Sequence, residues 1–551
     1  MSGALLQLAA LGSQDAYLTG NPEITLFKKK YHRYTHFASE TIQVSFDGGS
    51  IDFGSSNAAT STLEQSGDLI SKMVLVLKID AVTDSSVDWG YVNRLGHAII
   101  DEISVSIGQT EIDTHFGDWI NIYHDIYSNK SHETNYNKLI GNTSELKKLQ
   151  KSHTSLELFI PLYFWFCKST SSAFPICAIT KQNFQIKVRL NEAISCINYK
   201  GSVEPTSLPT ISSGYLLVDY IFLDNQERTL FMTQDHEYLI EQVQDMTDSV
   251  TSVNPRYNLI FDKPCKYLSW YINLKRYYQR TPFLSWATDD DWELAKTNFS
   301  KLIWLATRKD LDVSDTTNPV IKINSTFTNI GESIDLVTGG LSKLEELQAK
   351  VKAIFLFASV NTNNSNEYLA KATIDNVVLL ESSITYEDMS LTIDELKENA
   401  TSSTVHTTQS TFLDLNTISI IDAFNSGNNI NRTDNPIISA NLQLNGKDRF
   451  QERDAFYFNY LNPYYYFTNK PQDGINLYSF SLAPTEIQPS GTINFGQINT
   501  KELLIKLGQN NTIPSDTYFS KFFQEGRIRI FVYNYTLLKV SPKRNLVGLA
   551  Y

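Results

Sequence analysis

A chain of 551 residues has room for two large β domains, because all-β units often run to about 200–250 residues each. Its 42% hydrophobic content indicates a globular protein that can bury a core without covalent staples. The formal net charge of −13, from 47 basic and 60 acidic residues, argues against a protein that coats nucleic acid by neutralising phosphates.

Cysteine usage and the start of the chain both indicate a protein made and kept on the cytosolic side. The four cysteines form no CxxC pair and show no spacing typical of a disulfide framework or a zinc site. We interpret them as buried thiols: Cys167, Cys177, Cys196 and Cys265. Residues 1–12 lack the basic and long apolar regions of a secretory signal, and no run of about 18 apolar residues occurs.

Residues 1–20 are predicted to form an N-terminal arm. Its leucines are spaced roughly as on one helical face, which fits either an arm that docks on a neighbour or a frayed end. The stretch 19–22 (TGNP) predicts a turn, because glycine tolerates positive φ, proline fixes its own φ, and the residue before proline avoids the helical region. We expect a strand to begin directly afterwards, where Ile24 and Leu26 alternate with their neighbours.

Short apolar runs separated by polar turns fill residues 21–225 and predict a sandwich or jelly roll. The runs with strand character cover residues 70–80, 102–112, 156–179, 184–190 and 215–223. Gly108 predicts a hairpin-like break, and Ile186 and Val188 are expected to face the interior. Residues 118–127 instead carry apolar side chains at helical spacing, and we expect this helix to cap an end of the barrel.

Residues 226–250 are predicted to form a helical connector between two domains. Asp224 is followed three residues later by Glu227, which matches a capping box. The apolar residues that follow fit helical spacing: Leu230, Tyr238, Leu239 and Val243.

Residues 251–551 are predicted to form a second β domain with long insertions in about 276–436. The inserted region holds two tryptophans, Trp286 and Trp292, and a helical pattern at 341–351. Residues 399–435 are rich in Ser, Thr and Asn, and we interpret them as an exposed loop because they have little to bury.

A set of residues near the start of the chain resembles the N-terminal signature of the major capsid proteins of nucleocytoplasmic large DNA viruses. The set comprises Asp15, Tyr17, Thr19, Gly20, Asn21, Pro22, Phe27, Lys28, Tyr31, Arg33 and Phe37. Further blocks resemble the same family in the expected order, at 218–228, 236–242, 259–274, 442–459, 474–480 and 488–491. The resemblance covers both ends and the middle of the chain.

This resemblance implies an all-β chain of two consecutive eight-stranded jelly rolls, a double jelly roll, with a few short helices and long surface loops. It also implies a structural protein rather than an enzyme: a homotrimeric, nearly hexagonal capsomer that tiles an icosahedral virion, assembled in the host cytoplasm. The implied partners are the chain itself, neighbouring trimers, and minor capsid and penton proteins, with indirect contact to an inner membrane and none to nucleic acid. Outward loops are the implied place for contact with a host cell.

Candidate chemical sites are few, and we expect no catalytic residue, cofactor or metal site. Residues 28–33 are basic and fit either acidic partners and lipid head groups or a solvated strand end. His32 and His36 lack a third ligand, and residues 289–291 (DDD) are explained by an acidic turn without calcium-loop spacing. Candidate glycosylation sites are Asn298, Asn324, Asn363, Asn399 and Asn431, with further sequons at Asn142, Asn510 and Asn534.

A carbohydrate-binding or carbohydrate-cleaving jelly-roll protein is the alternative, because jelly rolls also serve lectins and aromatic loops can stack on sugars. A glycosidase would need two carboxylates about 5 to 10 Å apart in a cleft, which a sequence cannot reveal.

Overall fold

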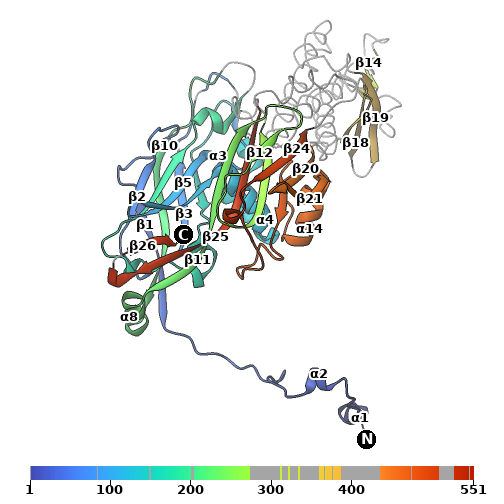
Figure 1. Cartoon of the computed structure of the whole chain (residues 1–551). Helices are drawn as coiled ribbons and strands as arrows, with labels where there is room; N and C mark the ends of the chain where they lie inside the picture. Colours follow the sequence, from blue (N-terminus) through green and yellow to red (C-terminus); the bar gives the residue numbers. More distant parts are fainter. Residues whose placement is uncertain are drawn as a thin grey trace.

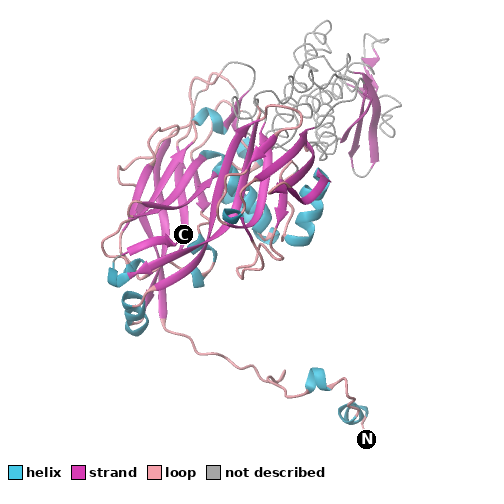
Figure 2. Cartoon of the chain, viewed as in Figure 1, coloured by secondary structure: helices cyan, strands magenta, loops and turns pink. Residues whose placement is uncertain are grey.

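The computed structural model describes residues 2–273, 435–507 and 526–550, except 84, 88, 148–149, 200–203, 473 and 545, together with six short strands between 311 and 385. Two β-sandwiches lie side by side, and an extended N-terminal arm leads away from them (Figures 1 and 2).

The first sandwich consists of two four-stranded antiparallel sheets. One has the order β1 (Phe37–Ser45), β10 (Ile211–Leu223), β3 (Leu69–Ile79) and β7 (Leu156–Pro161). The other has the order β2 (Ala59–Leu63), β8 (Phe184–Leu190), β5 (Ile100–Ile107) and β6 (Thr110–Phe116). Buried and half-buried residues alternate along β8, so the inward orientation predicted for Ile186 and Val188 is confirmed. Two short strands, β4 (Trp89–Tyr91) and β9 (Ile197–Tyr199), pair with each other.

The second sandwich is built in the same way from the end of the chain. One sheet has the order β11 (His236–Ser249), β25 (Arg527–Ser541), β13 (Pro264–Asn273) and β22 (Asn476–Ser479). The other has the order β12 (Arg256–Asn258), β24 (Lys501–Leu507), β20 (Ile437–Leu444) and β21 (Lys447–Asp454). The short strands β23 (Ile493–Asn494) and β26 (Leu546–Ala550) add to β13 and β25.

The two sandwiches share one topology. When the eight sandwich strands of each half are numbered in chain order, both halves have one sheet ordered 1-8-3-6 and one ordered 2-7-4-5. This arrangement of two packed sheets is a jelly roll. The predicted double jelly roll is therefore confirmed, and the fold repeats although the sequence does not.

The insertion in the second jelly roll falls between its third and fourth strands. Its described strands form two separate three-stranded sheets: β14 (Leu311–Asp312), β15 (Val320–Lys322) and β16 (Ser333–Asp335), then β17 (Ser359–Asn364), β18 (Glu367–Ile374) and β19 (Val377–Thr385). Trp286, Trp292, residues 289–291, the predicted helix at 341–351 and the predicted loop up to residue 434 lie outside the described residues.

The described residues form short helices, of which α1 and α2 lie in the arm and the others at the sandwiches (Figure 1). They are α1 (Gly3–Ala9), α2 (Ala16–Thr19), α3 (Leu95–Ile99), α4 (Gly117–Tyr127), α5 (Glu133–Leu139), α6 (Ser144–Lys147), α7 (Trp165–Lys168), α8 (Asn225–Thr233), a π-helix η7 (Tyr457–Leu461) and α14 (Asn462–Tyr466). The helix predicted at 118–127 is confirmed as α4. It lies between the two sandwiches rather than over the end of one barrel (Figure 1).

The predicted helical connector at 226–250 is correct only in its first half. Asp224 caps α8, since its carboxylate accepts hydrogen bonds from the backbone N–H groups of Gln226 and Glu227 at 3.0 and 2.9 Å. Residues 236–249, however, form β11 and pair along their whole length with β25. Tertiary pairing overrides the helical spacing of Tyr238 and Val243.

The strand expected directly after Pro22 is also wrong, because β1 begins only at Phe37. Ile24 and Leu26 are 78% and 89% exposed, so the alternating residues have no sheet and no core to pack against. The turn at 19–22 carries its positive φ on Asn21 (+51°), not on Gly20.

Candidate assembly surfaces

The junction between the two jelly rolls buries one face of the second. Along β13 and β25 the residues are buried almost without alternation, which means that both faces of this sheet are covered. The inner face packs on its own sandwich. The outer face is covered by α4 and α7 of the first jelly roll, and the buried apolar residues of both halves form one contiguous core.

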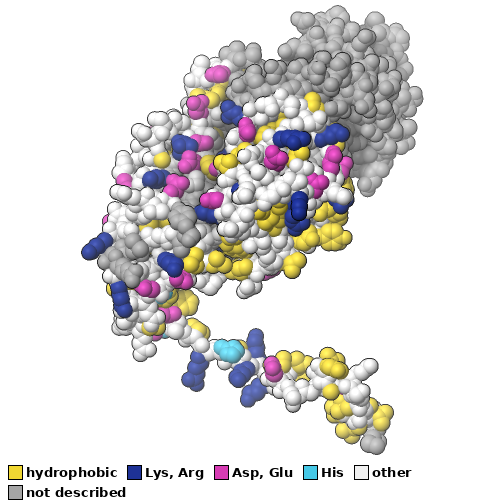
Figure 3. Space-filling view, viewed as in Figure 1, with side chains coloured by type: hydrophobic (Ala, Val, Ile, Leu, Met, Phe, Trp, Pro, Cys, Tyr) yellow, Lys and Arg dark blue, Asp and Glu magenta, His cyan; other side chains and the backbone are white. Residues whose placement is uncertain are grey.

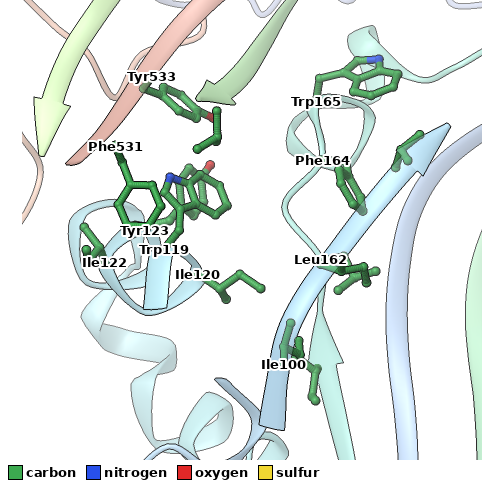
Figure 4. Packing of buried hydrophobic residues seen from close by; sticks show 14 of the residues in the cluster. Ile100, Trp119, Ile120, Ile122, Tyr123, Leu162, Phe164, Trp165, Phe531 and Tyr533 are labelled. Atoms are coloured by element: carbon green, nitrogen blue, oxygen red, sulfur yellow. The ribbon is translucent and has the colours of Figure 1, made fainter. Parts of the chain in front are cut away.

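Aromatic side chains fill the centre of this junction. Trp119, Tyr123 and Tyr127 follow one another at four-residue spacing along α4 and surround Tyr533 of β25, with ring centroids 5.9, 6.2 and 6.4 Å away. Phe531 lies beside Trp119 and Tyr123 (Figure 4). Its ring centroid is 6.2 Å from that of Phe116. Aromatic pairs contribute about 0.5–1.5 kcal/mol each beyond the area they bury. The stripe on α4 is therefore a docking surface for the second jelly roll.

One buried lysine, one half-buried lysine and one glutamate bridge the junction beside these rings. Lys168 of α7 pairs with Glu241 of β11 at 2.6 Å, and Lys266 of β13 pairs with the same carboxylate. Burial lowers the pKa of Lys266 to about 8, although Glu241 opposes the shift. Burial alone would raise the pKa of Glu241, but the two ammonium groups outweigh it and hold that pKa below its ordinary value. The ring of Tyr533 lies 4.4 Å from the Lys168 ammonium and 5.2 Å from that of Lys266, which adds cation–π attraction.

A second ion pair fixes the start of α4. The guanidinium of Arg529 on β25 pairs with Asp118 at 2.6 Å and with Asp245 at 3.3 Å, and its carbon lies 4.2 Å from the ring centre of Phe116. The hydroxyl of Tyr271 donates to the same Asp118 carboxylate. An acidic residue in the first helical turn also favours the helix dipole. Both the packing and the charges of α4 thus depend on the second jelly roll, so the two sandwiches form one rigid unit.

The N-terminal signature residues lie in the exposed arm, apart from the Phe37 that starts β1. Asp15, Thr19, Gly20 and Asn21 shape the local turn: the Asp15 carboxylate accepts from the Gly12 N–H at 2.7 Å, and the Thr19 hydroxyl donates to the Asp15 carbonyl at 2.8 Å. A Cβ at position 20 would collide with the carbonyl oxygen of Ala16, so glycine is required there.

The other signature side chains point into solvent. Tyr17 is 92% exposed and Phe27 97%; Tyr31 is 79% exposed, and Phe37 is still half exposed at 52%. Pro22, Lys28 and Arg33 are exposed as well. The structure does not gather these residues into one pocket but spreads them along a segment that leaves the body (Figure 3).

The arm differs from the body in charge. Residues 2–36 contain four basic side chains (Lys28, Lys29, Lys30, Arg33) and two acidic ones (Asp15, Glu23), a net charge of +2, which leaves −15 for the rest of the chain. The leucines of α1 and its surroundings are more than half exposed. Exposed apolar and basic side chains in one segment are typical of a surface that binds a partner.

The cysteines and histidines give no reactive or metal-binding site within the described ranges. All four cysteines are free; Cys177, Cys196 and Cys265 are buried as predicted, and Cys167 is partly exposed. Burial raises the pKa of the Cys177 thiol to about 11, which makes it a poor nucleophile. No described group of three or more His, Cys, Asp or Glu side chains could hold a metal ion, and His32 and His36 lie in the exposed arm.

The structure bears on few of the sequons. Asn298, Asn324, Asn399, Asn431 and Asn510 lie outside the described residues, and Asn363 lies in β17. Asn534 is fully buried in β25 and donates to Gln244 at 3.1 Å, so it is inaccessible to glycosylation in the folded protein. None of the helices that the structure describes is long and apolar enough to cross a membrane.

Comparison with known proteins identifies the family. Residues 25–224 match the family described as "Major capsid protein N-terminus", and residues 227–543 match "Large eukaryotic DNA virus major capsid protein". The chain belongs to the major capsid proteins of large eukaryotic DNA viruses. The family predicted from the sequence is thus confirmed, and the chain is a structural capsid protein of the virion.

Relatives in this family match along their full length. Capsid protein 1 of Acanthamoeba polyphaga mimivirus is 30% identical over 617 residues, and the major capsid protein of Phaeocystis pouchetii virus is 28% identical over 586; in both cases the alignment covers 100% of each chain. Among solved structures, VP54 of PBCV-1 superposes with a TM-score of 0.60 at 22% identity, covering 96% of this chain and 100% of VP54. The Faustovirus major capsid protein gives 0.59 at 10% identity, covering 98% and 96%. These structures share the fold.

Sequence reasoning missed the docking role of α4. The helical spacing of Trp119, Ile122, Tyr123 and Ile126 predicted the helix, but not which surface covers it. Lys168, Glu241 and Lys266 carried no signal, because charged residues in β-rich segments are usually solvated.

Proposed function

We propose that three copies of this major capsid protein form a homotrimeric, nearly hexagonal capsomer that tiles an icosahedral shell. The observation that carries the proposal is the repeated strand order of two jelly rolls fixed in one rigid unit. Three such units place six similar sandwiches around one axis. Closed cyclic symmetry is the usual arrangement of soluble homo-oligomers, and heterologous contacts close into rings.

Burial of apolar surface between subunits can supply enough free energy for a permanent trimer. Permanent interfaces bury roughly 2,000–5,000 Å², and about 25 cal/mol per Å² of the apolar part gives tens of kcal/mol before association costs. Jelly rolls pair most strand edges within their two sheets, which limits open-edge aggregation in a crowded shell.

We assign the remaining contacts by the chemistry of the exposed surfaces. The basic, apolar arm suits minor capsid and penton proteins with acidic surfaces, through which the shell contacts an inner membrane indirectly. Acidic overall charge disfavours direct contact with the genome. Assembly in the host cytoplasm and contact of outward loops with a host cell complete the proposal. The family assignment favours this structural role over the carbohydrate alternative.

The native mass of the purified protein tests the trimer. Size-exclusion chromatography with light scattering, repeated across dilution, should give a species near 187.5 kDa, three times the chain mass of 62.5 kDa. The mass should resist dilution. A monomer at every concentration would contradict a self-sufficient trimer, and glycan binding by that monomer would revive the alternative.

A further inference from the structure

β1 leaves one of its edges open at the end of the body from which the arm departs (Figure 1). Its nine residues pair with β10 along their whole length. In the part of the chain that the structure describes, no strand pairs with the other edge of β1. A row of unpaired N–H and C=O groups of this kind is a template for a further strand. We call this side of β1 the free edge.

The free edge lacks the protection that other edge strands carry. Six of the eight residues of β21 are charged, which is a usual defence of an exposed edge. The edge strand β11 is covered by the first jelly roll, since the N–H group of Val243 donates to the Asp113 carboxylate of β6 at 3.0 Å. Among the nine residues of β1, only Glu40 is charged. The composition of β1 therefore permits a further strand to pair with it.

The core of the first jelly roll is incompletely covered at the free edge. Ile42 and Val44 point inward and pack on the core, but both stay half-buried. Their partners on β10, Val218 and Leu216, are fully buried. A strand with apolar residues at every second position would cover Ile42 and Val44 on the side where β1 has no neighbour.

The arm holds a segment with this pattern. Ile24 and Leu26 alternate with their neighbours, yet they are 78% and 89% exposed because no sheet lies beside them. Antiparallel pairing that places Leu26 opposite Ile42 also places Ile24 opposite Val44, since positions two apart share a face of a strand. The two apolar pairs then lie over the uncovered part of the core.

The same register matches a charge and an aromatic ring. Glu40 faces inward and would oppose an apolar strand, but this register places Lys28 opposite it, and opposite charges attract across a sheet. It also places Tyr31 opposite Phe37, and these rings are 79% and 52% exposed. Such cross-strand pairs contribute about 0.2–1 kcal/mol each. One register thus pairs apolar, charged and aromatic side chains with suitable partners.

The arm of a chain is held away from its own free edge. Residues 32–36 would have to form the loop of a hairpin, and their sequence, HRYTH, contains none of the turn residues Gly, Pro, Asn and Asp. In the structure these residues form no turn, and the arm runs away from the body (Figure 1). An arm in this conformation reaches the free edge of a second copy instead, as in domain swapping.

We propose that residues 24–31 of one copy add to the free edge of a second copy as an antiparallel strand, so that the arms link copies by strand exchange. The chain from residue 31 to residue 37 spans at most about 20 Å, so the two copies meet where their β1 strands begin. The inference is independent of the proposed trimer, because the junction between the jelly rolls contributes neither the strand nor the edge.

A labelled peptide of residues 20–31 tests the free edge on the complete protein. Added in excess at high dilution of the protein, the peptide should compete with the arms, and fluorescence anisotropy measures its binding. N-methylation removes a backbone donor and keeps the side chain. The N–H groups of residues 24 and 26 point to one side of a strand and those of 25 and 27 to the other.

The two doubly methylated peptides are therefore matched controls for each other. The peptide methylated on the side that faces β1 should bind at least about tenfold more weakly than the other, since it loses two hydrogen bonds. Equal binding by the two peptides, or no binding by the unmodified peptide, overturns the inference. Native mass across dilution tests the trimer separately.

A cross-link between complete chains measures the exchange itself. Chains with Thr25→Cys and chains with Gln43→Cys, mixed and oxidised, should form a linked pair above the background of unmodified chains. Gln451→Cys, on the charged edge strand β21, is the matched control and should give no linked pair with Thr25→Cys. A chain with both Thr25→Cys and Gln43→Cys should link to a second copy. Closure within one chain, or no link at all, overturns the proposed exchange.

Discussion

Replacing Glu241 with glutamine should destabilise the junction strongly, because it leaves two ammonium groups without their shared counter-charge. The side chain of Lys266 is only 1% exposed and that of Lys168 16%. Removing one partner of a buried ion pair typically costs about 3–5 kcal/mol. Partial exposure of Lys168 and loss of the Lys266 proton limit the damage, so we expect a loss of about 3 kcal/mol in the free energy of unfolding at neutral pH.

The pH dependence of this loss in the free energy of unfolding tests whether the unpaired charge of Lys266 causes it. The pKa of Lys266 is about 8 with Glu241 present and must be lower without it. Below about pH 8 there is therefore a pH window in which the folded variant has released this proton while the original chain keeps it. Because the unfolded lysine stays protonated, the stability of the variant rises with pH in this window and the difference between the two proteins shrinks.

Urea unfolding followed by tryptophan fluorescence, at fixed protein concentration, measures both effects. The matched control is Glu241→Gln combined with Lys266→Met, which removes the stranded charge and should recover part of the loss. A single variant within about 0.5 kcal/mol of the original chain, or a double variant less stable than the single one, would refute the reasoning.

Three further predictions concern other parts of the chain. His97 and His124 are buried, and burial lowers both pKa values, that of His124 to about 4, so both rings are neutral in the folded protein. Since the unfolded rings bind protons near pH 6.5, the free energy of unfolding should fall as the pH drops from about 6.5 to about 4, by roughly 3 kcal/mol for His124. The variant His124→Gln should flatten the slope of the urea midpoint against pH. An unchanged slope contradicts this prediction. Trp119→Ala should cost about 3–5 kcal/mol in urea unfolding, whereas the exposed Tyr464→Ala should cost under about 0.5; equal losses would contradict the buried stripe. Deleting residues 2–36 should leave the melting temperature unchanged in calorimetry and reduce co-sedimentation with acidic partner proteins; a clear drop in melting temperature would show that the arm supports the fold.

Local chemistry explains what the sequence could predict. The hairpin at Gly108 depends on one positive φ of +62°, and the cap of α8 depends on Asp224 and the two N–H groups that follow it. The alternation along β8 directly reflects one buried and one half-buried face. In each case the residues that decide the structure are adjacent in the chain.

Distant partners explain what the sequence could not predict. Residues 236–249 fit helical spacing, yet they form a strand because β25, from the far end of the chain, pairs with all of them. The arm residues after Pro22 alternate like a strand but find no sheet beside them. Both faces of the sheet are covered at β13 and β25. The cover on the outer face comes from the first jelly roll, so the sequence of the two strands alone does not reveal it.

The place of β25 in the chain sets an order for biosynthesis. β25 is the central strand of its sheet, bonded to both β11 and β13, and its Asn534 meets a partner in β11 that lies 290 residues earlier. The first jelly roll can close as soon as β10 leaves the ribosome, whereas the second must wait until the last residues are made. A prematurely terminated chain therefore lacks the strand that carries Arg529, Phe531 and Tyr533, and cannot build the face that α4 binds. The fold itself thus excludes incomplete products from the shell.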